Sequence, residues 1–150
     1  MSKRRAERLG HMVGYDHVAR CIEFSHELCE RSTRQRVLHA DLYAENVLFD
    51  ADGKPVFIDP HAKIGSPAFD WAFWCVYYLP TSGFEDRVAL CREYVPDEFE
   101  EALAWSATLA VDGALYYLDT DDDTASAMLA VLDSEPLAQL SPRAVGYPLR

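Results

Sequence analysis

The spacing of apolar residues divides the chain into a helical stretch, a short β segment and a longer helical part. From Tyr15 to about Arg34 apolar side chains recur every three or four residues, which predicts a helix with Asp16 as its N-cap. The pattern then changes, because "NVLF" and "PVFI" are short apolar runs on either side of "DADGK". The Asp-Gly pair between them is typical of a hairpin turn. Residues 36–60 are therefore predicted to contain a β-hairpin.

The remainder of the chain is predicted to be mostly helical. "WAFWCVYYL" is apolar on every side, as in a buried helix, and Pro80 and Gly83 end it. Further helices are predicted at about 84–94 and 97–118, and "DTDDDT" precedes a last one near 124–134. Residues 1–14 are predicted to be a basic connector, and residues 135–150, with three prolines, an irregular tail. The predicted fold class is mostly α with a small β-hairpin (α+β), in one domain over residues 15–134.

The hairpin brings polar side chains to its open end. Antiparallel pairing about the Asp-Gly turn sets Val47 opposite Ile58, and one further step sets Asn46 opposite Asp59. Opposed residues in a ladder lie about 4.5–5.5 Å apart and point to the same face. Amide and carboxylate oxygens suit Mg²⁺, which takes a few protein ligands together with substrate phosphates and water. We therefore expect Asn46 and Asp59 to form a magnesium site.

Asp41 stands five residues before Asn46, far enough for a loop to bring its carboxylate to the same place. A carboxylate beside an incoming hydroxyl can orient that group and accept its proton. The alternative for these residues is turn chemistry alone, with Asp41 forming an Asx-turn, Asn46 starting a strand and Asp59 preceding a proline. The register of the hairpin favours the chemical interpretation.

These residues carry a resemblance to a known family. "HADLYAEN", followed by "VLFDADGKPVFIDP", resembles the catalytic loop and metal-binding aspartate of the protein-kinase-like superfamily. Asp-Pro in place of Asp-Phe-Gly is most similar to the aminoglycoside phosphotransferase family, and the surrounding residues look like its streptomycin and hydroxyurea phosphotransferase subgroup. "GSPAFDWAFW" is similar to that family's Gly-Asp-Pro-x-x-Asp segment. Ala40, Tyr43 and Ser66 depart from the usual glycine, histidine and aspartate, and Ala40 should be tolerated unless its position needs a positive φ.

The resemblance implies an activity and a role for each matching position. The activity is ATP-dependent transfer of a γ-phosphate to a hydroxyl of a small, cationic, aminoglycoside-like acceptor, with antibiotic resistance as the outcome. The implied roles are Asp41 as the catalytic aspartate, Asn46 and Asp59 as ligands of Mg²⁺ and ATP, His39 as a loop-shaping residue and Asp70 as support of the site. The alternative for Asp70 is the N-cap of a helix that begins at Trp71.

The resemblance also implies a second lobe, with a glycine-rich loop and a strand lysine for the ATP phosphates. Neither pattern precedes His39. We therefore expect a protein-kinase-like C-terminal lobe from which the N-terminal ATP lobe is absent, a truncated or split product. The isolated chain is expected to bind Mg-ATP weakly, to turn over slowly or not at all, and to expose an apolar lobe-facing surface. The alternative is a non-catalytic remnant or docking fragment of such a kinase.

Charge and hydropathy limit the partners. With 14 Lys and Arg against 25 Asp and Glu the formal net charge is -11, which argues against nucleic acid and suits a cationic ligand, although acidity also serves solubility. Asp112 and Glu101 are interpreted most simply as a solvated helix face; contact with a cationic substrate is the alternative that the resemblance raises. No apolar run approaches the roughly 18 residues of a membrane span. We expect a cytoplasmic protein without a membrane partner, and fold resemblance does not identify its acceptor.

Overall fold

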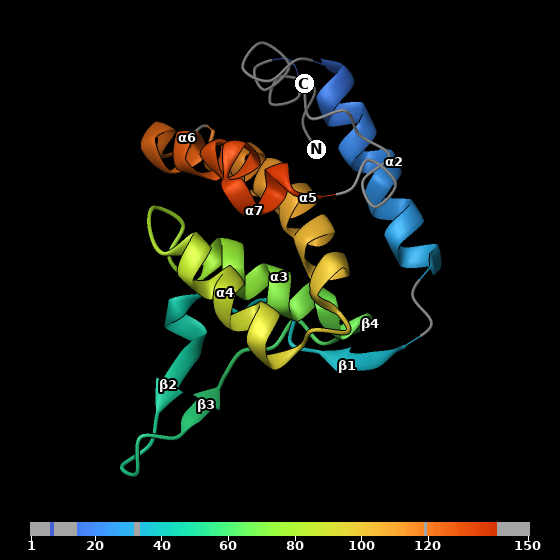
Figure 1. The fold of residues 1–150 in the computed structure, drawn as a ribbon. Coiled ribbons are helices and arrows are strands. Elements are labelled where there is room, and N and C mark those ends of the chain that lie inside the picture. The colour runs from blue at the N-terminus through green and yellow to red at the C-terminus, as the bar shows by residue number, and fades with distance from the viewer. Residues whose placement is uncertain (1–6, 8–14, 32–33, 119, 141–150) are drawn as a thin grey trace.

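The computed structural model describes Glu7 and residues 15–31, 34–118 and 120–140 (Figure 1). The predicted connector, apart from Glu7, and the part of the predicted tail beyond residue 140 lie outside the described residues. The described chain is mostly helical and carries two small antiparallel strand pairs. This confirms the predicted α+β class. In the part of the chain that is described, no helix is long and apolar enough to cross a membrane.

The core is built around helix α5, Phe99–Tyr117. It packs against α3 (Pro67–Tyr77), α6 (Asp122–Ala130) and α2 (Tyr15–Arg31). Residues around its whole circumference are buried, as expected for a helix enclosed by others. Helix α2 runs beside α5 and begins at the predicted residue, so that Asp16 lies in its first turn instead of at the N-cap (Figure 1).

Helix α3 begins at Pro67. A helix with Asp70 as its N-cap would begin four residues later, at Trp71. Ser66 is its N-cap, and the Ser66 hydroxyl accepts a hydrogen bond from the backbone N–H of Ala68 at 3.3 Å. Pro67 occupies the first helical position, where a missing N–H costs nothing. Asp70 therefore lies inside the first turn, and the interpretation of Asp70 as the N-cap of a helix from Trp71 is wrong.

Helix α4, Phe84–Tyr94, is fixed across the end of α3 by a buried arginine. The Arg87 side chain donates from Nε to the Cys75 carbonyl at 2.9 Å and from Nη2 to the Leu79 carbonyl at 3.1 Å. Carbonyls at a helix C-terminus lack helical partners and form the negative end of the helix dipole. Burial lowers the pKa of the Arg87 guanidinium, and these acceptors offset the cost of placing the cation there.

The C-terminal elements confirm one expectation and correct another. Asp121 is the N-cap of α6, because its Oδ1 accepts a hydrogen bond from the Thr124 N–H at 3.0 Å, so the acidic turn does precede a last long helix. A 3-10 turn, Val131–Asp133, and a one-turn helix α7, Glu135–Ala138, follow. The prediction that the chain is irregular from residue 135 is wrong at α7. Burial of Leu137 holds this turn against the core, and Pro136 fits its start.

The predicted hairpin is present, but its register differs by one residue. Strand β2, Val47–Phe49, pairs with β3, Pro55–Phe57, so that Val47 faces Phe57 and not Ile58. The Ile58 N–H donates to the Asn46 carbonyl at 3.0 Å, which makes Ile58 the partner of Asn46. The predicted opposition of Asn46 and Asp59 is therefore wrong.

The turn explains the shift. The Asp50 N–H donates to the Lys54 carbonyl at 2.9 Å and the Gly53 N–H to the Asp50 carbonyl at 3.0 Å, which closes a three-residue loop with Gly53 at φ 77°. The Asp50 carboxylate accepts two further bonds, from the N–H groups of Asp52 and Lys54, both at 2.9 Å. These bonds favour the three-residue loop over the two-residue Asp-Gly turn, and a one-residue slip moves each side chain to the other face.

A second strand pair flanks segment 39–62, which contains Asp41, Asn46 and Asp59. Strand β1, Arg36–Leu38, pairs with β4, Lys63–Gly65, in a register that sets Leu38 opposite Lys63. Each strand is three residues long and its partner is distant in sequence, so the hydrophobic pattern did not predict them. Figure 1 shows the β2–β3 hairpin extending away from the helices, with β1 and β4 side by side near α5. The β1–β4 pair therefore brings together the two ends of segment 39–62.

Candidate functional site

The structure brings Asp41 and Asn46 together in the loop between β1 and β2. The Asn46 side-chain Nδ2 donates to the backbone carbonyl of Asp41 and to its carboxylate Oδ2, both at 2.9 Å. Asn46 is buried at the end of a short 3-10 turn, Ala44–Asn46, and Asp41 is half-buried. The amide therefore fixes both the backbone and the side chain of Asp41.

Asp70 holds this loop from α3. Its Oδ2 accepts a hydrogen bond from the His39 N–H and its Oδ1 one from the Ala40 N–H, both at 2.8 Å. Bonds to an ionised acceptor are stronger than those between neutral groups. Ala40 has φ 60°, in the left-handed region that favours glycine, so this position does need a positive φ. The two hydrogen bonds that Asp70 accepts offset the strain at Ala40.

His39 connects the loop to the chain that follows the hairpin. Its ring Nε2 donates to the Ile58 carbonyl at 2.8 Å, and its backbone carbonyl accepts the His61 N–H at 2.9 Å. The His39 ring also lies edge-on to Phe57, with 6.2 Å between ring centroids. These contacts support a loop-shaping role.

The strain at Ala40 gives a prediction for stability. Ala40→Val is expected to lower the free energy of unfolding by about 2–3 kcal/mol, because a β-branched residue at positive φ is strained and the site is buried. Ala40→Gly serves as the control and should stay within about 1 kcal/mol of the natural chain, since relief of strain and loss of a buried methyl oppose each other. Urea unfolding measures both variants. Equal stability of the valine variant and the natural chain would contradict the left-handed backbone.

Asp59 lies outside the predicted ladder with Asn46. It is exposed and has φ 51°, so the chain turns sharply after Ile58 and the strand alternation ends there. Burial, followed by the negative charges of Asp41, Glu45 and Asp59, raises the pKa of the Tyr43 hydroxyl. The structure therefore brings Asp41 and Asn46 together, whereas Asp59 forms no hydrogen bond with either of them within the described residues.

Asn46 and Asp59 carry donor atoms of the kind that Mg²⁺ prefers, an amide oxygen and a carboxylate. Asn46 Oδ1 and the Asp59 carboxylate have no hydrogen-bond partner in the described part of the chain, so both remain available as hard oxygen donors. No group of three or more His, Cys, Asp or Glu that could hold a metal occurs among residues 7, 15–31, 34–118 and 120–140. A magnesium site with only these two protein ligands would leave most coordination positions to phosphates and water, as Mg²⁺ prefers.

A cavity of about 510 Å³ opens beside Asp41. The loop contributes Asp41 and Tyr43, α3 contributes aromatic rings, and α5 contributes Asp112. The Tyr77 hydroxyl donates to Asp112 Oδ2 at 3.2 Å across the two helices. Burial and the charge of Asp112 raise the pKa of Tyr77, so this phenol stays protonated as a donor. Glu101, the other acid weighed on this helix, does not line the cavity.

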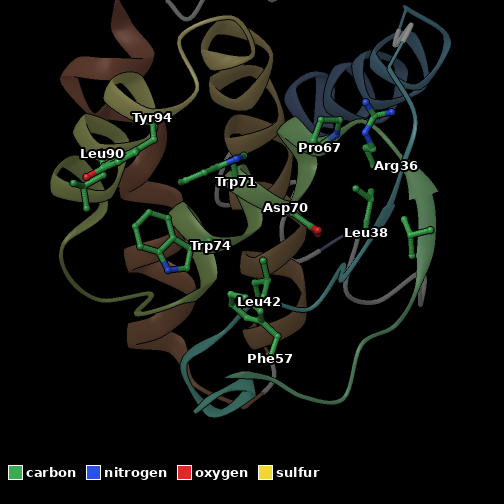
Figure 2. A pocket seen from close by; sticks show the side chains of 11 residues that line it. Arg36, Leu38, Leu42, Phe57, Pro67, Asp70, Trp71, Trp74, Leu90 and Tyr94 are labelled. Atoms are coloured by element: carbon green, nitrogen blue, oxygen red, sulfur yellow. The ribbon is translucent and has the colours of Figure 1, made fainter. Parts of the chain in front are cut away.

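A second cavity, of about 540 Å³, has a mostly apolar lining to which Arg36 and Asp70 also contribute. Figure 2 shows Trp71 and Trp74 of α3 lining it, together with Leu90 and Tyr94 of α4. Large exposed apolar side chains are found on the adjoining strands, among them Val37, Leu48, Phe57 and Ile64. An apolar surface of this kind is typical of an interaction site.

Several known proteins are similar in sequence to this chain. The model of the fructosamine kinase family matches residues 3–87, more than half of the chain and all of the loop and hairpin. A chloroplastic protein-ribulosamine 3-kinase of Oryza sativa subsp. indica is 35% identical over 71 residues, which are 46% of this chain and 21% of the relative. The protein of the same name from subsp. japonica is 34% identical over 71 residues, with the same coverage.

A bacterial protein is similar over a segment of comparable length. A probable ketoamine kinase of Enterococcus faecium is 32% identical over 74 residues, which are 39% of this chain and 26% of the relative. No solved structure matches the chain. The chain therefore spans about a quarter or less of the length of these curated relatives.

Proposed function

Because the chain belongs to the fructosamine kinase family, we propose that it carries the phosphoryl-transfer site of an ATP-dependent kinase for ketoamine sugars. The aminoglycoside phosphotransferase branch is not the family that matches, so the proposed acceptor changes from an aminoglycoside to a sugar amine. Antibiotic resistance is accordingly not part of the proposal. The reaction class is the same, because both kinds of kinase transfer a phosphoryl group to a hydroxyl.

The observation that carries the proposal is the contact between Asp41 and Asn46 at 2.9 Å, in a loop held by Asp70. In the proposed reaction the acceptor hydroxyl oxygen bonds to the γ-phosphorus, the bond to ADP breaks, and the hydroxyl proton passes to Asp41. The Asp41 Oδ2 is occupied by Asn46, which leaves Oδ1 to face the hydroxyl.

Asn46 and Asp59 would hold Mg²⁺ with the ATP phosphates. A magnesium ion bound there supplies positive charge opposite the phosphate oxygens, where charge develops during transfer. Asn46 has two roles in the proposed site. Its Nδ2 fixes Asp41, and its Oδ1, which faces away from that bond, would be the ligand of Mg²⁺. With Mg²⁺ bound, the same side chain would contact both the proton acceptor and the metal.

The proposal is tested with the purified chain at high concentration, Mg-ATP and three acceptors in parallel. These are 1-amino-1-deoxyfructose as the ketoamine, kanamycin as the aminoglycoside and glycerol as a neutral polyol. Because the isolated chain is expected to turn over slowly, the incubation is long; we expect mass spectrometry to detect slow formation of a phosphorylated ketoamine and little product from the other two. Product from kanamycin alone would return the acceptor to the aminoglycosides, and no product from any acceptor would remove catalysis from this chain.

A second candidate function is docking without catalysis. The apolar cavity between α3 and α4 and the exposed apolar side chains of β1 to β4 favour it. A docking lobe and a catalytic lobe share every residue of the loop, so the transfer assay separates them. A chain that yields no product, yet binds tightly to a partner through Trp74 and Phe57, would have this function.

A further inference from the structure

Two buried cysteines meet where α4 packs on α3, away from the loop that carries Asp41. Cys75 on α3 and Cys91 on α4 are each 1% exposed, and both are free thiols. Their side chains form a hydrogen bond with each other across the two helices. Two thiols in contact can be joined by a disulfide in a two-electron oxidation.

The arginine that fixes α4 across the end of α3 also sets the two thiols opposite each other. Arg87 Nε donates to the Cys75 carbonyl at 2.9 Å, so this face of α4 lies against Cys75. Cys91 stands four residues after Arg87 on the same helix, and positions i and i+4 of a helix share one face. Cys91 therefore points toward α3 one turn beyond the anchoring hydrogen bond, which agrees with its contact with Cys75.

The contact gives the two sulfur atoms different chemistry. The hydrogen bond from the Cys75 side chain lowers the pKa of the Cys91 thiol. The same hydrogen bond, together with burial, raises the pKa of the Cys75 thiol. The thiolate is the reactive form of cysteine, so Cys91 is the sulfur that reacts first and Cys75 is the one that keeps its proton.

We propose that Cys75 and Cys91 are a site of reversible oxidation, at which hydrogen peroxide joins α3 to α4 through a disulfide. The Cys91 thiolate attacks the O–O bond of the peroxide, which gives a sulfenic acid and releases hydroxide. The Cys75 sulfur then attacks the Cys91 sulfur and forms the S–S bond. The sulfenic oxygen leaves as water with the Cys75 thiol proton. The two thiols lose two electrons in total, and the peroxide is reduced to water.

Helix α4 is the element that opens to admit the oxidant and that the disulfide then holds. It buries only three of its 11 residues, and an element with so few buried side chains opens locally more readily than the core. Trp74 and Leu90, which line the apolar cavity between α3 and α4, are the chain neighbours of Cys75 and Cys91 (Figure 2). A disulfide therefore fixes the two walls of this cavity relative to each other.

The test maps disulfides by mass spectrometry after the intact chain has been treated with hydrogen peroxide. Trypsin cleaves after Arg87, which places Cys75 in the peptide of residues 64–87 and Cys91 in the peptide of residues 88–92. We expect these two peptides to be linked, and dithiothreitol to separate them. Cys29→Ser, which removes an exposed free cysteine, is the matched control and should form the same link. Cys91→Ser should not form it.

Hydrogen exchange of the α4 amides measures whether the bond holds the helix. In the linked chain this exchange should slow roughly 3- to 100-fold, because the disulfide restricts the opening of α4. Recovery of Cys75 and Cys91 as free thiols after peroxide treatment would overturn the proposal, as would their oxidation to sulfinic or sulfonic acid without a link. A linked chain whose α4 amides exchange at the original rate would overturn it as well. None of these measurements involves phosphoryl transfer, so the proposed function stands or falls separately.

Discussion

Asp41→Asn is expected to reduce phosphoryl transfer to a ketoamine roughly 10²- to 10⁴-fold, the contribution of a positioned general base. The reason lies in the loop geometry. Asp41 lines the cavity beside the expected acceptor, and the Asn46 amide fixes its carboxylate at 2.9 Å. An amide at position 41 keeps the size of the side chain but cannot accept the hydroxyl proton. The rate of product formation, measured by mass spectrometry at saturating Mg-ATP, gives the result.

The fold of this variant should be unaffected, and circular dichroism with urea unfolding serves as the check. Asp52→Asn is the matched control, because it makes the same change in an exposed turn residue at the hairpin tip. It should keep the full transfer rate. Equal rates for Asp41→Asn and the natural chain would remove Asp41 from the chemistry, whatever the sequence around it resembles.

Asp70→Ala is expected to give the largest loss of stability, about 2–4 kcal/mol. The variant loses two bonds of 2.8 Å from an ionised acceptor to the backbone of His39 and Ala40, and it leaves both N–H groups without that partner. The left-handed Ala40 then lacks the contacts that hold it. Urea unfolding should show a lower midpoint, and the transfer rate should fall as well because Asp41 follows directly in the loop.

Two variants test whether the loss of stability in Asp70→Ala comes from the two lost hydrogen bonds or only from the removal of a negative charge. Asp70→Asn keeps one carbonyl acceptor and should lose less stability than Asp70→Ala. Glu93→Ala removes an exposed acid from α4 and should change the free energy of unfolding by less than about 0.5 kcal/mol. An Asp70→Ala chain as stable as the Glu93→Ala chain would mean that α3 does not support the loop.

Periodicity was sufficient to predict the longer helices, because their apolar residues face a core that encloses them, but it did not predict the one-turn helix α7. The stripe from Tyr15 predicts α2, and the all-apolar run at Trp71 predicts the buried α3. The pairing of β1 with β4 was not predictable in this way, since three-residue strands carry too little pattern. β1 and β4 pair because the tertiary structure brings together the two ends of segment 39–62.

The hairpin shows why a motif can be identified correctly while its geometry is derived wrongly. The Asp-Gly pair suggested a two-residue turn, but the Asp50 carboxylate binds two backbone N–H groups and closes a three-residue loop. The strand register therefore differs by one residue from the predicted one, so that Asn46 pairs with Ile58 and not with Asp59. Asp112 illustrates the converse case, because its place in the cavity follows from how α3 packs on α5 and not from any local pattern.

The most direct test of the central claim is where a divalent ion binds on this chain. Mn²⁺ replaces Mg²⁺ at oxygen sites and broadens the NMR signals of nearby nuclei. In the presence of ATP we expect the strongest broadening at residues 41–46 and 59–61, with loss of this pattern in Asn46→Ala and in Asp59→Ala. Broadening centred instead on the acidic turns at residues 50–53 or 120–123, and unchanged in both variants, would contradict a shared site of Asp41, Asn46 and Asp59.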